Sequence, residues 1–339
     1  MKNPPTIKDV AKRANVSVAT VSRVLHNLSG YSSATKDKIL DAIEELGYQP
    51  NAIARGLVNK RTQTIGVLFP AVSGYFSSTL LHGIEEYAHS KGFSVIVCNT
   101  QDDGKRTMKY LQVLREKQVD GIIFASAEVK DEYDQAISEM RVPVVLVNTF
   151  SQKQIIPYVK IDDRLAAYQA TSYLIQNGHR EIAMISGTVG DRIAGSPRLE
   201  GYRQALEDHG IACVESRIAY GTFNMESGSQ AMERLLEGGV SFTAVFAASD
   251  EMAIGAMGAA MKKGITIPEE LSVIGFDDLE LSRAVYPSLT TIHQPLAQMG
   301  RMACEKLIAL IDDGEDVASS MVAHKLIERE SVSPLHRPS

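Results

Sequence analysis

The chain has 339 residues, of which 44% are hydrophobic and 22% charged, and its formal net charge is −6. This length favours two or three domains over a single core. The longest apolar runs, such as VPVVLV at 142–147, are the size of strands and exclude a membrane-spanning helix. The N-terminal residues lack the apolar stretch of a secretory signal, so we expect a cytoplasmic protein with no membrane partner. In that compartment we expect Cys98, Cys213 and Cys304 to be buried, reduced thiols, and we predict neither a metal site nor a cofactor.

The charge is divided unevenly along the chain. Residues 1–61 hold ten Lys and Arg against five Asp and Glu, a net charge of +5, which leaves −11 for the remainder. This basic first segment, here called the head, precedes a longer acidic segment, the body. The asymmetry predicts that only the head contacts a polyanion such as nucleic acid.

Three short helices are predicted in the head. Thr6 is a candidate N-cap, because Asp9 follows it in a capping-box position. The turn NVS at 15–17 separates this helix from a second one, which Ser17 caps. A third helix runs from about Ala34 to Leu46, and its period predicts that the inward residues are Ile39, Leu40, Ile43 and Leu46. Two helices joined by a tight turn and supported by a third form the helix-turn-helix pattern.

The second helix of this pattern enters the major groove of DNA. Val21, Val24 and Leu25 form its apolar side, and the other side carries Val18, Ala19, Ser22, Arg23 and His26. Val18 and Ala19 suit thymine methyl groups, and Arg23 suits the O6 and N7 atoms of guanine. The hydroxyl groups of Ser17, Thr20 and Ser22 suit phosphates. The alternative is an exposed helix whose small residues have no partner.

A connecting segment, YQPNAIARGLVNKRTQT at 48–64, follows these helices. Asn51 is a candidate N-cap for two helical turns at 52–58, which are too short to be stable alone. We expect them to fold on docking, with Leu57 as an apolar wedge for a minor-groove base step. The alternative is that the segment only connects two domains.

TIKDVAKRANVSVATVSRVL, followed by YQPNAIARGL, resembles the DNA-binding head and hinge helix of the LacI/GalR family of bacterial transcription regulators. The resemblance implies operator contacts from several of the exposed residues of the second helix and from the hinge helix, with Leu57 as the intercalating leucine. The full set of residues expected to bind DNA is Thr6, Ser17, Val18, Ala19, Thr20, Ser22, Arg23, His26, Asn51, Ala54, Arg55 and Leu57.

In the body, short apolar runs alternate with helical patterns. The runs lie at 65–70, 93–98, 121–126, 142–148, 181–187, 244–249 and 272–278, and the helical patterns at 76–90, 105–117, 164–177, 198–209, 225–237 and 251–262. This alternation predicts parallel sheets with right-handed crossovers. The length suits two sheets of about five or six strands each.

Ligands bind at the carboxyl ends of strands in open α/β sheets, and a cleft between two lobes is a frequent pocket. Carboxylates, amides, arginines and aromatic rings gather at the predicted strand ends, a mixture that suits a polyol. These candidate effector residues are Tyr75, Phe76, Asn148, Arg192, Arg198, Phe223, Asp250, Asp277 and Gln294. Acidic residues at such positions also cap helices, and Asp163 and Asp250 fit that role equally well.

The body resembles the same family in GSPRLEGYRQAL (195–206), TAVFAASDEMAIGAM (243–257), LSVIGFDDLELS (271–282) and LTTIHQP (289–295). The resemblance implies a periplasmic-binding-protein-like effector domain, and it assigns every candidate effector residue except Gln294 to the pocket. LAQMGRMACEKL (296–307) lacks the charged set of those relatives that answer to a phosphorylated carrier protein, which argues against that mode here.

We therefore predict a small all-α helix-turn-helix domain followed by a body of two parallel-sheet α/β lobes. The expected boundaries are 1–48 for the DNA-binding domain, 49–61 for the hinge helix and linker, and 62–339 for the effector-binding and dimerisation domain. Within the body, we expect an N-lobe of about 62–161 plus 293–320 and a C-lobe of about 162–292 plus 321–337.

The sequence thus predicts a dimeric regulator, without catalytic activity, that binds a palindromic operator. We expect a repressor of carbohydrate-utilisation genes, controlled by a sugar or sugar derivative between the lobes. A purine- or sugar-acid-responsive regulator of the same family is an alternative, and so is a solute-binding protein without DNA function. A nucleotide-dependent enzyme is disfavoured, because no GxGxxG follows IGVLFP, no P-loop motif occurs and no nucleophile–base pair is evident.

Overall fold

The computed structural model describes residues 5–25, 29–48, 61–101, 103–151, 155–312, 314 and 317–335. The chain divides into two compact units, Met1–Gln63 and Thr64–Ser339, which correspond to the head with its connecting segment and to the body. Within the described residues, no helix combines the length and the apolar character that crossing a membrane requires.

The described part of the head consists of α1 (Ile7–Ala14), α2 (Val18–Leu25) and α3 (Ser33–Leu46). Their inner faces form a small core of Val10, Ala11, Ala14, Val21, Val24, Ile39 and Ala42. The predicted helix-turn-helix arrangement is confirmed, but the prediction that Leu40 points inward is wrong, since its side chain is 46% exposed. Consecutive helical residues are about 100° apart, so a face centred on Ile39 and Ala42 leaves residue 40 outside.

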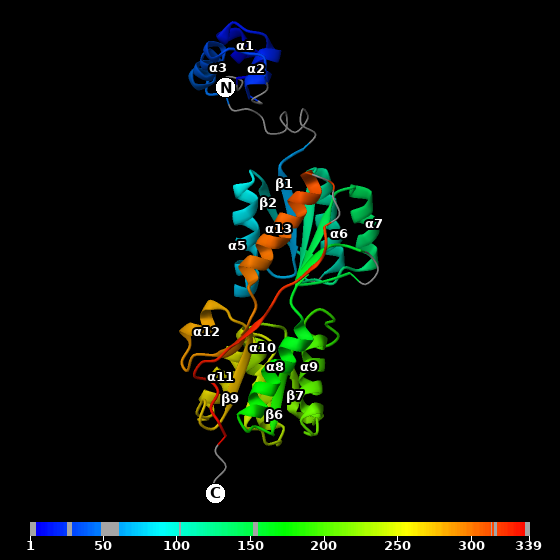
Figure 1. Ribbon diagram of the computed structural model, residues 1–339, viewed down its shortest axis with the longest axis vertical. Coiled ribbons are helices and arrows are strands. Elements are labelled where there is room, and N and C mark those ends of the chain that lie inside the picture. The colour runs from blue at the N-terminus through cyan, green and yellow to red at the C-terminus, as the bar shows by residue number, and fades with distance from the viewer. Residues whose placement is uncertain are drawn as a thin grey trace. The chain divides into compact units, whose positions relative to one another are not determined.

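The N-lobe of the body is a six-stranded parallel sheet in the order β11-β5-β4-β3-β1-β2. Helices α5 (Tyr75–Ser90) and α13 (Leu296–Asp312) cover one face, and α6 (Gly104–Glu116) and α7 (Asp131–Met140) cover the other (Figure 1). Successive residues of β1 point to opposite faces of the sheet. Val67 packs into the core on one face, and Leu68 packs into the core on the other. The strands are β1 (Thr64–Phe69), β2 (Ser94–Asn99), β3 (Gly121–Ala125), β4 (Val144–Val147), β5 (Tyr158–Lys160) and β11 (Ser320–Met321).

The C-lobe repeats this plan with the order β12-β10-β9-β8-β6-β7, in which only β12 runs antiparallel to its described neighbour. Helix α8 packs against α9, and α10 packs against α11. The strands are β6 (Ile182–Ser186), β7 (Ile218–Tyr220), β8 (Ala244–Ala247), β9 (Ser272–Asp277), β10 (Thr290–His293) and β12 (Lys325–Ile327). The helices are α8 (Asp163–Gln176), α9 (Gly195–Asp208), α10 (Met225–Glu237), α11 (Asp250–Lys262) and α12 (Glu280–Ala284), with a short 3₁₀ turn at Glu215–Arg217.

The chain passes between the two lobes after β5, after β10 and between β11 and β12 (Figure 1). Each sheet has six strands, so the predicted pair of parallel-sheet lobes is confirmed. The carboxyl ends of β1 to β4 and of β6 to β9 are the edges at which the candidate effector residues stand.

The three cysteines do not share one environment. Cys98 and Cys304 are buried, and burial raises the pKa of their thiols to about 11 and about 12 respectively. Cys213 is exposed and free, so the prediction that all three are buried is wrong for this residue. It lies in the connection between α9 and the 3₁₀ turn, outside the periodic elements that bury the other two.

Candidate functional site

Helix α2 exposes the face on which base contacts are predicted. Val18 is 41% exposed, and Ala19 and Arg23 are also exposed, whereas Val21 and Val24 are buried in the head core. Ser17 caps the helix, since its Oγ accepts the backbone N–H of Thr20 at 3.1 Å. The result is a firmly started helix that presents short side chains and one guanidinium.

Polar contacts are also present in the two helices that flank α2. The carboxylate of Asp9 accepts the hydroxyl and the backbone N–H of Thr6 at 2.7 and 2.8 Å, and these bonds lower the pKa of Asp9. Arg13 of α1 forms an ion pair with Glu45 of α3 at 2.5 Å. Thr6 therefore starts α1 as expected, while its role toward DNA stays a prediction.

Arg23 lies beside the loop that leads to α3. Gly30 has a φ of +106°, which favours glycine, and a Cβ at this position would lie 3.2 Å from Nη1 of Arg23. The small loop residue thus leaves room for the guanidinium. The other predicted DNA-binding residues, His26, Asn51, Ala54, Arg55 and Leu57, lie outside the described residues.

In the body, Arg198 of α9 is the centre of a buried polar cluster. Its Nε and Nη2 donate to Oδ1 of Asp163 at 3.0 and 2.8 Å, and its Nη1 donates to the carbonyl of Ala248 at 2.6 Å. The guanidinium also lies over the ring of Phe276, 3.7 Å from the centroid. Because Arg198 is only 2% exposed, these contacts fix its charge at the carboxyl ends of β8 and β9.

Asp277 ends β9 beside this guanidinium. Its Oδ1 lies 4.0 Å from Nη1 of Arg198 and accepts a hydrogen bond from Nε2 of Gln294 at 2.7 Å. Burial raises the pKa of Asp277 well above its ordinary value, although the charge of Arg198 acts in the opposite direction. A carboxylate in this position gains from any ligand that donates a hydrogen bond to it.

On the N-lobe side, Asn148 stands at the carboxyl end of β4. Its Nδ2 donates to Oγ of Ser126 at 3.4 Å, whereas its Oδ1 is buried without a hydrogen-bond partner among the described residues. Oε1 of Gln294 is in the same state. Buried acceptors without a partner are rare in folded proteins, and they suit a hydroxyl-bearing ligand or water. Tyr75 and Phe76 start α5, and Tyr75 is 45% exposed.

The remaining candidates are less closely joined to the cluster. Arg192 is exposed in the connection between β6 and α9. Phe223 follows β7 and packs so closely against Gly187 that a Cβ there would lie 2.1 Å from its ring. By direct contact, the structure brings together Arg198, Asp277 and Gln294.

Asp250 ties three segments of the C-lobe together. It is completely buried, and its Oδ2 accepts the backbone N–H of Leu279 at 2.8 Å and the hydroxyl of Ser282. Its Oδ1 accepts the hydroxyl of Thr291 at 2.5 Å. Both carboxylate oxygens are therefore occupied by groups of the same lobe.

The alternative that Asp163 and Asp250 cap helices is wrong. The N-caps are the residues just before them, Asp162 for α8 and Ser249 for α11, because a cap precedes the first helical residue. Asp163 instead holds Arg198, a pairing that the sequence analysis missed. The acidic side chain at a strand end signalled a role, but its partner depends on how α8 packs against α9.

Two family descriptions match the chain. "Bacterial regulatory proteins, lacI family" covers residues 6–51, and "Periplasmic binding proteins and sugar binding domain of LacI family" covers residues 62–330. The chain belongs to the LacI family. It is 39% identical over 328 residues to catabolite control protein A of Priestia megaterium, a match that covers 96% of this chain and 98% of the relative.

Solved LacI-family structures agree with this assignment. The lac repressor dimer bound to operator and the anti-inducer ONPF has a TM-score of 0.88 at 27% identity, covering 98% of this chain and 100% of that one. The transcriptional regulator CelR in complex with cellobiose has a TM-score of 0.74 at 32% identity, covering 96% and 99%. The protein is thus a DNA-binding transcription regulator and not an enzyme. The DNA-binding family match at residues 6–51 argues against the alternative of a solute-binding protein without DNA function.

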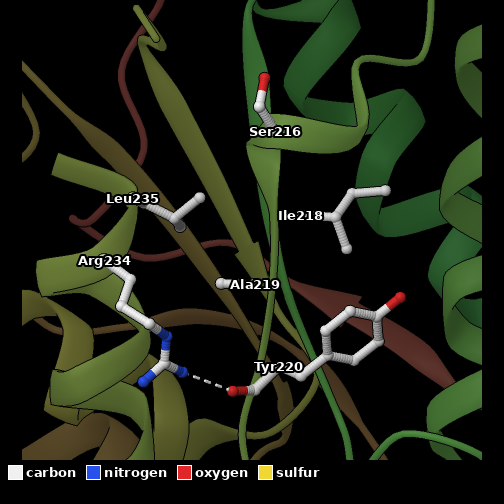
Figure 2. Close-up of a pocket in the computed structure, with 6 residues that line it drawn as sticks. All are labelled: Ser216, Ile218, Ala219, Tyr220, Arg234 and Leu235. Atoms are coloured by element: carbon white, nitrogen blue, oxygen red, sulfur yellow. Dashed lines mark hydrogen bonds between the residues drawn. The ribbon is translucent and has the colours of Figure 1, made fainter. Parts of the chain in front are cut away.

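This LacI-family body also has a hollow of about 250 Å³ beside the edge strand β7 (Figure 2). Nη2 of Arg234 donates to the carbonyl of Tyr220 at 2.8 Å there. The hollow is lined by Ser216, Ile218, Ala219, Tyr220, Arg234 and Leu235, none of which is a candidate effector residue. It is therefore separate from the cluster around Arg198.

Proposed function

We propose that this LacI-family regulator is a homodimeric, cytoplasmic repressor of carbohydrate-utilisation genes whose effector is a neutral, hydroxyl-rich molecule such as a sugar. The observation that carries the proposal is the charge of the buried cluster. The carboxyl groups of Asp163 and Asp277 lie 2.8 and 4.0 Å from the guanidinium of Arg198, and the ammonium of Lys160 lies 3.4 Å from Asp163. Both cations of this cluster already have a carboxylate partner, so a further anion buried there would lack a positive charge to balance it.

Hydroxyl groups match the polar atoms that the site offers. They can donate to Asp277 and to the unpartnered carbonyl oxygens of Asn148 and Gln294, and they can accept from the remaining N–H groups of Arg198. The rings of Tyr75 and Phe76 provide flat apolar faces for C–H groups. We assign Asp250 a positioning role, because its oxygens are already occupied.

The relatives support the same reading. One similar structure is a regulator bound to cellobiose, and another is a repressor dimer bound to its operator. An effector of the sugar-acid or purine class would need further cationic or aromatic contacts, for which Arg192 and Phe223 are the available side chains. Arg192 is exposed, whereas Arg198 and Asp277 are buried.

On DNA, we propose that α2 of each protomer lies in the major groove of one half-site, where Arg23 contacts guanine. The two hinge helices at 52–58 would pair over the centre of the operator, with Leu57 as the wedge. Effector binding between the lobes would change the spacing of the hinge starts. A coupling free energy of about 1–3 kcal/mol is enough to move operator occupancy substantially.

A thermal-shift screen tests the effector class. Full-length protein is heated with neutral mono- and disaccharides, sugar phosphates, uronates and purines, because a ligand that binds only the folded state raises the melting temperature. We expect a neutral sugar to raise it, and we expect no rise with the same sugar in an Asp277→Asn variant. Stabilisation by sugar phosphates, uronates or purines alone would contradict the proposed class.

A further inference from the structure

Among the described residues of the N-lobe, no side chain caps the start of helix α5. Its N-cap residue is Gly74, so its first N–H groups lack the local cap that Asp103 gives to α6 and Asp162 gives to α8. The acceptor comes from the other lobe. Oε1 of Glu251 accepts the backbone N–H of Tyr75 at 3.2 Å, across 176 residues of sequence.

Glu251 lies at the start of a helix of the C-lobe whose position is fixed by hydrogen bonds. It is the second residue of α11 and is half-buried. The residue before it, Asp250, is bound to Leu279, Ser282 and Thr291, which fixes the start of α11. The carboxylate of Glu251 meets the amino end of α5, where the helix dipole favours negative charge. The contact therefore combines a hydrogen bond with a charge–dipole interaction.

The approach of Glu251 depends on the small residue at position 74. A Cβ on Gly74 would lie 3.2 Å from Oε1 of Glu251. The backbone of Gly74 is extended, with φ −84° and ψ 154°, so other residues can adopt it without strain. Glycine at this position therefore serves the cross-lobe contact and not a special backbone conformation.

We infer that Glu251 is a positioning residue of the effector response, because its carboxylate caps α5 from the other lobe and latches the two lobes in the disposition seen here. The link to the effector rests on the proposed function, since α5 begins with Tyr75 and Phe76, two of the candidate effector residues. The latch itself requires neither effector nor DNA. An effector that changes the relative position of the lobes must therefore break this hydrogen bond or act through it.

Hydrogen exchange of the full-length protein tests the latch without any ligand. Peptides covering 72–80 report the start of α5, and peptides covering 161–163, 293–295 and 322–324 report the crossovers between the lobes. We expect Glu251→Ala to speed exchange at residues 75–77 by about three- to tenfold, the size expected for the loss of a charged cap. The crossover peptides should exchange faster as well. Glu226→Ala, in the first turn of α10, is the matched control and should change neither region.

A second variant separates a latch from a simple helix cap. Gly74→Asp supplies a carboxylate cap from within the N-lobe and repels Glu251. We expect it to keep the start of α5 protected while the crossovers exchange faster, as they do in Glu251→Ala. Unchanged exchange at residues 75–77 in Glu251→Ala would overturn the contact. Unchanged exchange of the crossover peptides in both variants would overturn the latch. Neither result would bear on operator recognition or on the outcome of the sugar screen.

Discussion

We predict that Arg23 is the residue of the head on which base reading depends most. It is the cation on the exposed face of α2, and Gly30 leaves space for its guanidinium. Arg23→Ala should therefore weaken binding to a selected operator by about 1–3 kcal/mol, with much less loss on random DNA. Fluorescence anisotropy with both duplexes at one salt concentration measures this difference. Lys38→Ala, on the exposed side of α3, is the control, and equal losses on both duplexes for Arg23→Ala would refute base reading by this residue.

Asp277, a proposed effector contact, should also make the stability of the protein depend on pH. Because burial raises its pKa, the folded protein keeps this proton to higher pH than the unfolded chain does. The contribution of Asp277 to stability therefore falls as pH rises from the ordinary carboxyl pKa of about 4 toward the raised value. Asp277→Asn removes that titration, so its melting temperature should rise relative to the natural protein as pH increases through this window.

Differential scanning calorimetry from about pH 4 to about pH 8 measures the effect of Asp277→Asn over the range in which the linkage acts. Glu233→Gln, an exposed substitution on α10, is the control for a general change in net charge. A constant difference in melting temperature between Asp277→Asn and the natural protein across this range would show that Asp277 carries no such linkage.

Close helix pairs shape the body at the level of elements. Helices α5 and α13 touch at Gly83, where a Cβ would lie 1.9 Å from the carbonyl oxygen of Ala297. Gly258 of α11, in contrast, has no atom within 4 Å of such a Cβ. Two glycines with the same helical setting therefore differ completely in the space around them.

The same substitution should act in opposite directions at these two glycines. Gly83→Ala should lower the free energy of unfolding by about 1–3 kcal/mol, because the helices must move apart. Gly258→Ala should raise it by about 0.5–1 kcal/mol, because alanine is the better helix former. Urea denaturation measures both, and a stabilised Gly83→Ala protein would contradict the close packing of α5 on α13.

Most elements of the body could be predicted because each buried strand is a contiguous apolar run and each helix follows a regular period. The exceptions are short. Strands β5, β7, β10, β11 and β12 lie outside the predicted apolar runs, because each holds only two to four residues, too few for a period to be visible. Leu40 was misplaced for a related reason, since a helix rich in apolar residues allows more than one inward face.

The candidate site could be predicted in part at the scale of the whole molecule. Strand ends placed Arg198 and Asp277 at one sheet edge, and the structure brings them to 4.0 Å. Their partners depend on tertiary packing, which single positions do not encode: Asp163 reaches Arg198 from another helix, and Glu251 reaches α5 from the other lobe. Such contacts between distant segments are the part that sequence reading cannot supply.

We propose that the head of this LacI-family regulator reads an inverted repeat and that a ligand bound to the body controls operator binding. Selection of bound sequences from a random duplex library by the full-length protein at moderate salt tests it most directly. We predict enrichment of one inverted repeat, and release or tightening of that duplex by the sugar that raises the melting temperature. Failure of any inverted repeat to be enriched over bulk DNA, with and without the screened metabolites, would contradict the claim.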